Sequence, residues 1–348
     1  MEYIEYKIQK GETLESIAKK HNLSTDELLH YHNSNSGLTQ KIFGDFIPFH
    51  IKSILIHSDY FEKPKEKEEF PSTLPYSFSE NARYKIEIST SLYFMGKPIS
   101  KNTTESKWQI NYNDLDNSIL VEVLDKNHVE VDGQIKPLLE IIDKINKTTD
   151  VLHLELNENK TIKKVINLEE VLKNWEKIKF DELKFYELED DYFKLIVEAY
   201  DKEFSALSQS LEKNIFYQIF FYPQNNIQIP TNNYRKIEEK KHTISQLFPQ
   251  QSIYYDLSYK TETESSDIKV ICSAISSKKW NKNALEKEYK KNYTQLLDDP
   301  FQFEFTLDAK YIHDKNGVLK NGKIFIKEKA NEQLFYISKY TISLLNEE

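Results

Sequence analysis

The chain has 348 residues and a formal net charge of −9, with 30% charged and 13% aromatic residues. This length suffices for two or three compact units, and the acidic balance argues against nucleic acid as a partner, because phosphates require a basic face. The single cysteine excludes an internal disulfide. Only seven glycines are present, so phosphate-cradling loops, which need bare backbone, and nucleotide cofactors are not expected.

Membrane and export signals are not predicted. No segment approaches the roughly 18 apolar residues that a membrane span requires. Residues 1–5 show neither a positive n-region nor an apolar h-region, so no signal peptide is predicted. We therefore expect a cytoplasmic protein without a membrane span, with export by a secretion machine that reads no N-terminal signal as the alternative.

The first 35 residues predict a short strand followed by two helices. Tyr6 and Ile8 alternate with polar residues, as in a half-buried strand, and Gly11 permits a tight turn. Thr13 is placed to cap a first helix, and residues 24–27 fit a capping box for a second. The apolar residues of the first helix share one face: Leu14, Ile17 and Ala18.

This order of elements, continued to Asn33, resembles the LysM module, a small βααβ fold, and we assign residues 1–57 to it. The chain departs from the family at the closing segment, residues 42–48, where Asp45 replaces a common glutamine; the apolar residues 51–56 offer another closing strand. The resemblance implies a shallow groove for N-acetylglucosamine glycans between the first strand–helix turn and the loop before the last strand. Carried over by position, this groove for a glycan or a protein partner consists of Gly11, Glu12, Thr13, Leu14, Ile42 and Phe43.

The rest of the chain predicts a linker and an α+β body. Residues 58–80 combine mixed charge with prolines and serines, which is typical of an exposed linker. Residues 81–222 alternate strands and helices, and residues 250–348 form a second strand-rich α+β domain or half of the same body. Mainly antiparallel sheets packed by helices on one side are expected, with the clearest helix at residues 191–214 and a hairpin turn at Asn321-Gly322.

Catalytic and metal sites are not predicted. Cys272 and His313 are the one thiol–imidazole candidate, but Cys272 lies in an apolar run that indicates a buried thiol. His128 and His153 lie on strand-like segments without ligand spacing. His30 and His32 are two residues apart on a helix, so their side chains point in different directions and do not form a chelating pair.

The sequence is compatible with three functions. The body resembles uncharacterised C-terminal regions of cytoplasmic bacterial LysM proteins, some of which are linked to contractile, type VI-like secretion. This favours a non-catalytic adaptor whose LysM-like module docks on a protein partner, such as a secretion spike or its cargo. A peptidoglycan- or N-acetylglucosamine-binding protein is the alternative, and a LysM-targeted cell-wall hydrolase is the third hypothesis.

Overall fold

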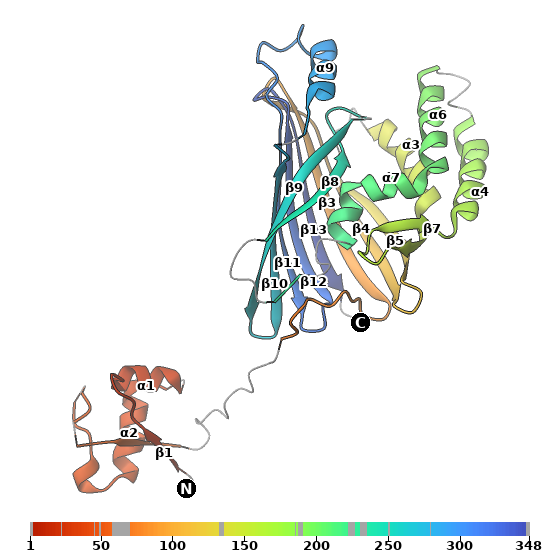
Figure 1. The fold of residues 1–348 in the computed structure, drawn as a ribbon. Coiled ribbons are helices and arrows are strands. Elements are labelled where there is room, and N and C mark those ends of the chain that lie inside the picture. Colours follow the sequence, from red (N-terminus) through yellow and green to blue (C-terminus); the bar gives the residue numbers. More distant parts are fainter. Residues whose placement is uncertain are drawn as a thin grey trace. The chain divides into compact units, whose positions relative to one another are not determined.

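The computed structural model describes residues 3–21, 23–44, 46–48, 50–57, 70–131, 136–184, 186, 191–221, 227–229, 235–249, 251–278 and 280–345. The chain divides into two units, Met1–Glu69 and Phe70–Glu348 (Figure 1), which we call the N-terminal module and the body. Each unit has its own hydrophobic core.

The N-terminal module is a βααβ unit, as predicted. Its elements are β1 (Tyr3–Lys7), α1 (Leu14–Lys20), α2 (Thr25–Asn35), a 3₁₀ turn η1 (Leu38–Gln40) and β2 (Ser53–His57). β1 and β2 pair antiparallel. Both helices begin at the predicted caps, because Thr13 and Ser24 each form a capping box with the residue three positions on. The closing strand comes from the second apolar run, while the described residues of the 42–48 segment form no strand.

Within the described residues, the body holds one eleven-stranded sheet with the order β7-β6-β5-β4-β3-β13-β12-β11-β10-β9-β8. Its strands are β3 (Ala82–Phe94), β4 (Lys97–Asn113), β5 (Ser118–Val131), β6 (Val151–Leu156), β7 (Ile162–Val165), β8 (Arg235–Ile244), β9 (Ser252–Glu264), β10 (Asp267–Ser276), β11 (Glu304–Asp314), β12 (Leu319–Lys329) and β13 (Leu334–Leu345). All neighbours are antiparallel. Pairing of β3 with β13 joins the two strand-rich segments in one sheet.

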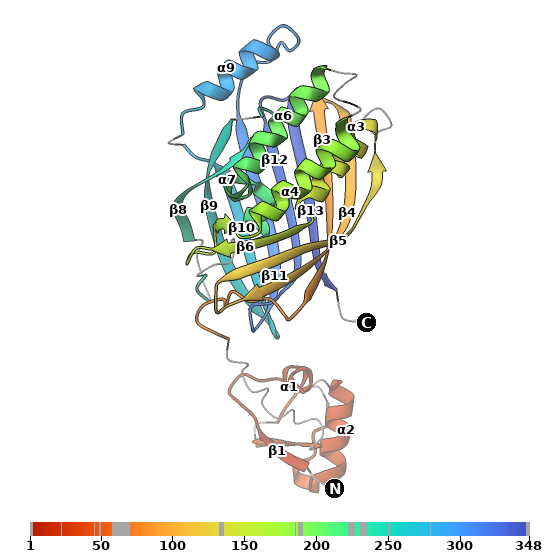
Figure 2. The same cartoon turned by 90° about the vertical axis from the view of Figure 1, so that its right-hand side faces the viewer.

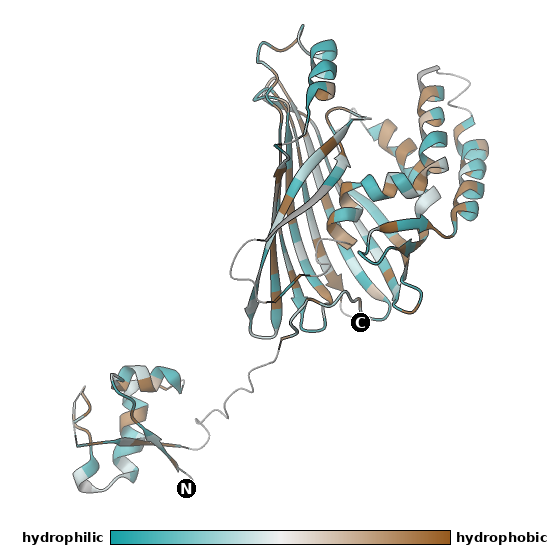
Figure 3. Ribbon diagram, viewed as in Figure 1, coloured by the Kyte–Doolittle hydropathy of each residue, from teal (hydrophilic) through white to brown (hydrophobic). Residues whose placement is uncertain are grey.

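Helices cover one side of this sheet, which agrees with the predicted α+β class. They are α3 (Lys136–Asn146), α4 (Leu168–Ile178), α6 (Asp191–Ser205), α7 (Leu207–Lys213), α8 (Ile215–Phe221) and α9 (Asn283–Asn292), with short η3 (Lys147–Thr149) and η4 (Lys179–Leu183) turns. Figures 1 and 2 show α3, α4, α6 and α7 gathered on one side and α9 at one end of the strands. Along the central strands hydrophobic and hydrophilic residues alternate (Figure 3), as a sheet with one solvated face requires.

Aromatic side chains of α8 fill the covered face. Phe216 lies 5.1 Å from Trp108 and 5.8 Å from Tyr340, and Phe220 lies 5.4 Å from Tyr84, measured between ring centroids. Phe220 is only 1% exposed. Because burying one large apolar side chain contributes roughly 2–3 kcal/mol, this aromatic layer is a main source of the body's stability.

The segment α7 contacts both edges of the sheet. The backbone N–H of Val165 in β7 donates to Ser208 Oγ at 3.0 Å, and Thr243 Oγ1 in β8 donates to the carbonyl of Lys213 at 2.9 Å. Exposed edge strands are sites of unwanted pairing. The helix thus covers part of both edge strands at once.

Three local predictions need correction. The single helix expected over residues 191–214 is broken at Ala206, whose φ of −112° and ψ of 29° separate α6 from α7. The hairpin turn between β11 and β12 lies at Gly317, with a φ of +87°, whereas Gly322 lies inside β12. Part of the expected linker packs on the body, since Leu74 is 2% exposed; residues 58–69 lie outside the described residues.

Candidate functional site

The β1–α1 turn of the N-terminal module is rigidly held by its own side chains. Gly11 has a φ of +90°, which a glycine adopts without strain. Tyr6 donates its hydroxyl proton to Glu12 Oε1 at 2.6 Å and accepts from Lys20 Nζ at 2.8 Å. The hydrogen bond from Tyr6 lowers the pKa of the Glu12 carboxyl. The side chains of Glu12 and of the capping residue Thr13 therefore form hydrogen bonds within the turn itself.

The α2–β2 loop is fixed by two polar side chains at the end of α2. Asn33 holds Ile42 through both backbone groups: Nδ2 donates to the Ile42 carbonyl and Oδ1 accepts from its N–H, each at 2.8 Å. His32 is 2% exposed; its Nε2 lies 2.8 Å from the Gln40 carbonyl, and its Nδ1 accepts from Leu55 N–H at 3.0 Å. These contacts require a neutral ring that donates through Nε2, and desolvation by burial lowers the pKa of His32.

The six groove residues expected from the resemblance fall into two groups. Leu14 and Ile42 are each 1% exposed and belong to the module's core, so their side chains do not line a surface. Gly11 and Thr13 are exposed, Glu12 is half-buried, and the ring of Phe43 is 77% exposed. The sequence analysis did not identify Phe46, which is 71% exposed. It also did not predict that His32 holds the loop, although the spacing of His32 four residues after the buried Leu28 indicates that His32 faces the core.

In the body, the candidate thiol and imidazole, Cys272 and His313, are not paired. Cys272 in β10 stands opposite Ala309, while His313 in β11 stands opposite Ile268. The two are thus four residues apart along the ladder, roughly 13 Å. Burial raises the pKa of the Cys272 thiol to about 12 and lowers the pKa of His313 to about 3, so the thiol is protonated and the imidazole neutral at ordinary pH.

His128 lies in a polar row that joins β4, β5 and α3. Its Nε2 is 2.5 Å from Asp143 Oδ2, its Nδ1 is 3.3 Å from Thr104 Oγ1, and Lys126 also pairs with Asp143 at 2.5 Å. The order hydroxyl, imidazole, carboxylate is that of serine hydrolases, but there the carboxylate orients Nδ1 and the hydroxyl faces Nε2. Here the nitrogens are reversed and a lysine shares the carboxylate, so the row fastens α3 to the sheet. His153 contacts Ser118 Oγ at 3.3 Å.

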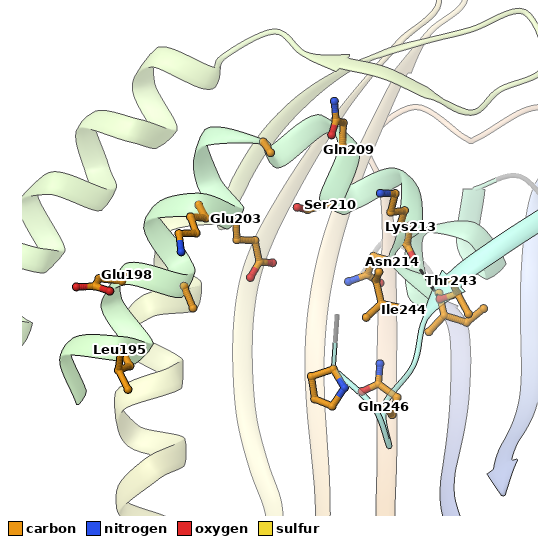
Figure 4. A pocket seen from close by; sticks show the side chains of 15 residues that line it. Leu195, Glu198, Glu203, Gln209, Ser210, Lys213, Asn214, Thr243, Ile244 and Gln246 are labelled. Atoms are coloured by element: carbon orange, nitrogen blue, oxygen red, sulfur yellow. Dashed lines mark hydrogen bonds between the residues drawn. The ribbon is translucent and has the colours of Figure 1, made fainter. Parts of the chain in front are cut away.

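A cleft of about 1020 Å³ lies between α6, α7 and the segment after β8. Figure 4 shows Glu203, Ser210 and Asn214 turned towards it from the helices and Gln246 from the opposite side. Desolvation raises the pKa of Glu203. Buried Glu328 holds the Gln246 segment, accepting from the hydroxyl of Ser245, from Gln246 N–H at 2.8 Å and from Leu247 N–H at 3.3 Å. The cleft therefore combines apolar side chains with a few carboxylate, hydroxyl and amide groups.

The described residues give little support for a metal site, a phosphate-binding loop or a membrane-spanning helix. No group of three or more His, Cys, Asp or Glu residues is arranged to hold a metal there. Gly317, Gly322 and Lys323 have the spacing of a phosphate-binding loop, which the scarcity of glycine did not lead us to expect. Ile324 stands where Ser or Thr is needed, and the segment joins two strands instead of a strand and a helix. Among the described helices, none has the length and apolar character to cross a membrane.

Comparison with known proteins places only the beginning of the chain. No protein with a curated description matches it. A solved structure described as lipid–protein interactions in lipovitellin covers 78% of this chain at 8% identity and a TM-score of 0.44, and the chain spans 26% of that protein. An outer membrane channel from Pseudomonas putida F1 covers 80% of the chain and is matched over 100% of its own length, at 7% identity and a TM-score of 0.17. Residues 6–31 match the model of the LysM domain family.

Proposed function

We propose that the N-terminal module binds glycans containing N-acetylglucosamine, and that the chain is a binding protein without a catalytic centre. The observation that carries the proposal is the LysM match over residues 6–31, joined to a βααβ structure with the two segments that flank the glycan groove in that family. The separation of Cys272 from His313 favours a non-catalytic body.

Internal hydrogen bonds that hold the β1–α1 turn and the α2–β2 loop in place support glycan binding by the module. A site formed in advance loses less conformational entropy on binding than one that must be ordered. The internal hydrogen bonds of Glu12 fix the turn, and Asn33 fixes the loop. The exposed ring of Phe43 offers an apolar face on which a sugar ring can pack.

A protein partner is the second candidate, favoured by a specific observation. Phe43 and Phe46, separated by only two residues, are 77% and 71% exposed, and exposed aromatic side chains are enriched where proteins dock. In this case the module is an adaptor and the same loop contacts a polypeptide. An association with a contractile secretion spike stays a prediction from the sequence resemblance.

Calorimetric titration of the full chain with an N-acetylglucosamine pentamer tests the first proposal. We expect saturable binding that Phe43→Ala weakens about fivefold, equivalent to roughly 1 kcal/mol of lost contact. Phe180→Ala, which removes a 66% exposed ring from the body, is the matched control and leaves the affinity unchanged. Absence of binding at millimolar pentamer excludes the glycan and leaves the protein partner, whose complex must then be lost with Phe43→Ala.

A further inference from the structure

The solvent-facing side of the central strands carries four lysines that form no ion pair with a described residue. On β11, β12 and β13 the residues that face the core alternate with those that face solvent. On these strands Lys320 and Lys329 form ion pairs, and on other strands of the sheet Lys85 pairs with Glu105 at 2.8 Å and Lys269 with Glu262 at 2.7 Å. The other four lysines on this side of β11, β12 and β13 form no ion pair with any described residue: Lys310, Lys323, Lys327 and Lys339.

The strand register places these four lysines around one phenylalanine. Lys339 stands directly opposite Phe325, and Lys323 and Lys327 flank Phe325 along β12. Lys310 is directly opposite Lys323 and therefore diagonal to Phe325. We call these five residues the lysine ring. Lys323 and Lys327 are roughly 13 Å apart along the strand, and neighbouring strands are about 4.8 Å apart.

The lysine ring is an unfavourable arrangement for the folded chain alone. Like charges placed directly opposite on adjacent strands repel, as Lys310 and Lys323 do. Asp308, which is opposite Phe325 and accepts from Ser273 Oγ at 2.9 Å, adjoins these lysines, and so does Glu87, which is diagonal to Lys339 on β3. Glu304 and Glu332 lie at the Lys327 end of the group, where both pair with Lys329, and Glu332 also interacts electrostatically with Lys327. The four ammonium groups thus outnumber the two carboxylates, Asp308 and Glu87, that adjoin them in the register, on a chain whose formal net charge is −9. A positively charged patch on an otherwise acidic chain is electrostatically complementary to an anionic partner.

We propose that the lysine ring binds a short acidic segment of a partner polypeptide. Carboxylates of that segment pair with the lysines, and an apolar side chain among them packs on half-buried Phe325. An extended peptide rises about 6.7 Å for every two residues, so acidic residues four positions apart match the spacing of Lys323 and Lys327. The surface is separate from the glycan site proposed for the N-terminal module.

The short distance over which charges interact in salt solution favours a short acidic segment over an extended anionic surface as the partner. Charges separated by more than about 8–10 Å are largely screened at physiological salt. A peptide confined to the ring therefore meets mainly the lysines. A nucleic acid or an anionic membrane extends beyond the ring and also meets the acidic remainder of the chain, which repels it.

Fluorescence anisotropy with the full chain and a fluorescein-labelled decaglutamate peptide tests the proposal. We expect saturable binding at 50 mM NaCl that weakens at 300 mM NaCl, as for contacts between charged groups. The variant K310Q/K323Q/K327Q/K339Q should bind at least tenfold more weakly. The matched control K85Q/K260Q/K269Q/K320Q removes four ion-paired lysines from the same sheet and should remain within twofold of the unaltered chain.

Three outcomes overturn the proposal. These are no saturable binding at 50 mM NaCl, an equal loss of binding in both quadruple variants, or tighter binding to phosphatidylserine vesicles or to a thymidine 20-mer than to the peptide. Tryptophan fluorescence of both variants verifies the folded body. A second acidic peptide with one central leucine should bind more tightly than decaglutamate, and Phe325→Ser should remove that gain.

Discussion

Glu328 is the most informative residue for testing the energetics of the body. It is 2% exposed on the core side of β12 and accepts three hydrogen bonds from residues 245–247, yet it forms no ion pair with any described residue. Burial raises the pKa of its carboxyl from 4.5 to about 7, because desolvation penalises the charged form more than the three donors stabilise it.

The sign of the pH effect follows from the raised pKa. Between pH 4.5 and about 7 the folded chain holds the Glu328 proton more tightly than the unfolded chain does. Stability from this group is therefore complete below pH 4.5, falls as pH rises, and is lost above about pH 7. At 1.36 kcal/mol per pKa unit, the shift corresponds to about 3 kcal/mol of unfolding free energy. Glu328→Gln cannot ionise and removes this dependence.

Urea denaturation followed by tryptophan fluorescence measures the effect, since all three tryptophans, Trp108, Trp175 and Trp280, lie in the body. The difference in unfolding free energy between Glu328→Gln and the unaltered chain should move by about 3 kcal/mol in favour of the variant from pH 4.5 to 8. Glu264→Gln, at an exposed strand end, should show a constant difference. A constant difference for Glu328→Gln as well would refute the argument.

Two further predictions concern single residues in each unit. The pKa of His32 is lowered by burial, so the unfolded module takes up the proton first and stability falls as pH drops below 6.5. Hydrogen exchange of the module's amides should show this loss, His32→Asn should abolish it, and His30→Asn, at an exposed position, should not. Gly317→Ala should destabilise the body by at least about 2 kcal/mol in urea denaturation, because its Cβ would lie 2.1 Å from the Pro75 carbonyl oxygen. Gly96→Ala has a similar φ of +71° without a close contact and should cost only about 1 kcal/mol; equal losses would show that the contact with Pro75 is unimportant.

Much of the N-terminal module could be predicted because its signals are local. Helix caps depend on residues three positions apart, and the cap at Thr13 and the capping box at residues 24–27 were both placed correctly. For the closing strand the sequence offered two candidates, residues 42–48 and residues 51–56, and did not decide between them. Asn33 occupies both backbone groups of Ile42, which prevents that residue from pairing in a ladder. This contact spans nine residues, so the local pattern did not contain it.

The hairpin between β11 and β12 shows where local signals are insufficient. Two Asn-Gly pairs, ending at Gly317 and Gly322, both predict a turn. The structure uses the first, where Gly317 packs against Pro75. At Gly322 a Cβ would lie 3.2 Å from the ring of Tyr311 on the neighbouring strand, so this glycine makes room for an aromatic residue. Packing partners distant in sequence decide between two equal local signals.

Strand register decides which chemical groups meet on the body, and a single sequence does not fix register across an eleven-stranded sheet. The same register separates Cys272 from His313 by four positions and sets Lys310 directly opposite Lys323. In the linear sequence the thiol and imidazole are candidates for a pair, whereas the four lysines are distributed through mixed-charge segments. Nothing in the sequence predicts that these lysines lie together. A shift of two residues between β11 and β12 would keep every apolar side chain facing the core, yet would dissolve the arrangement around Phe325. The binding chemistry of this face is therefore a property of the pairing, which is why it becomes visible only in the folded sheet.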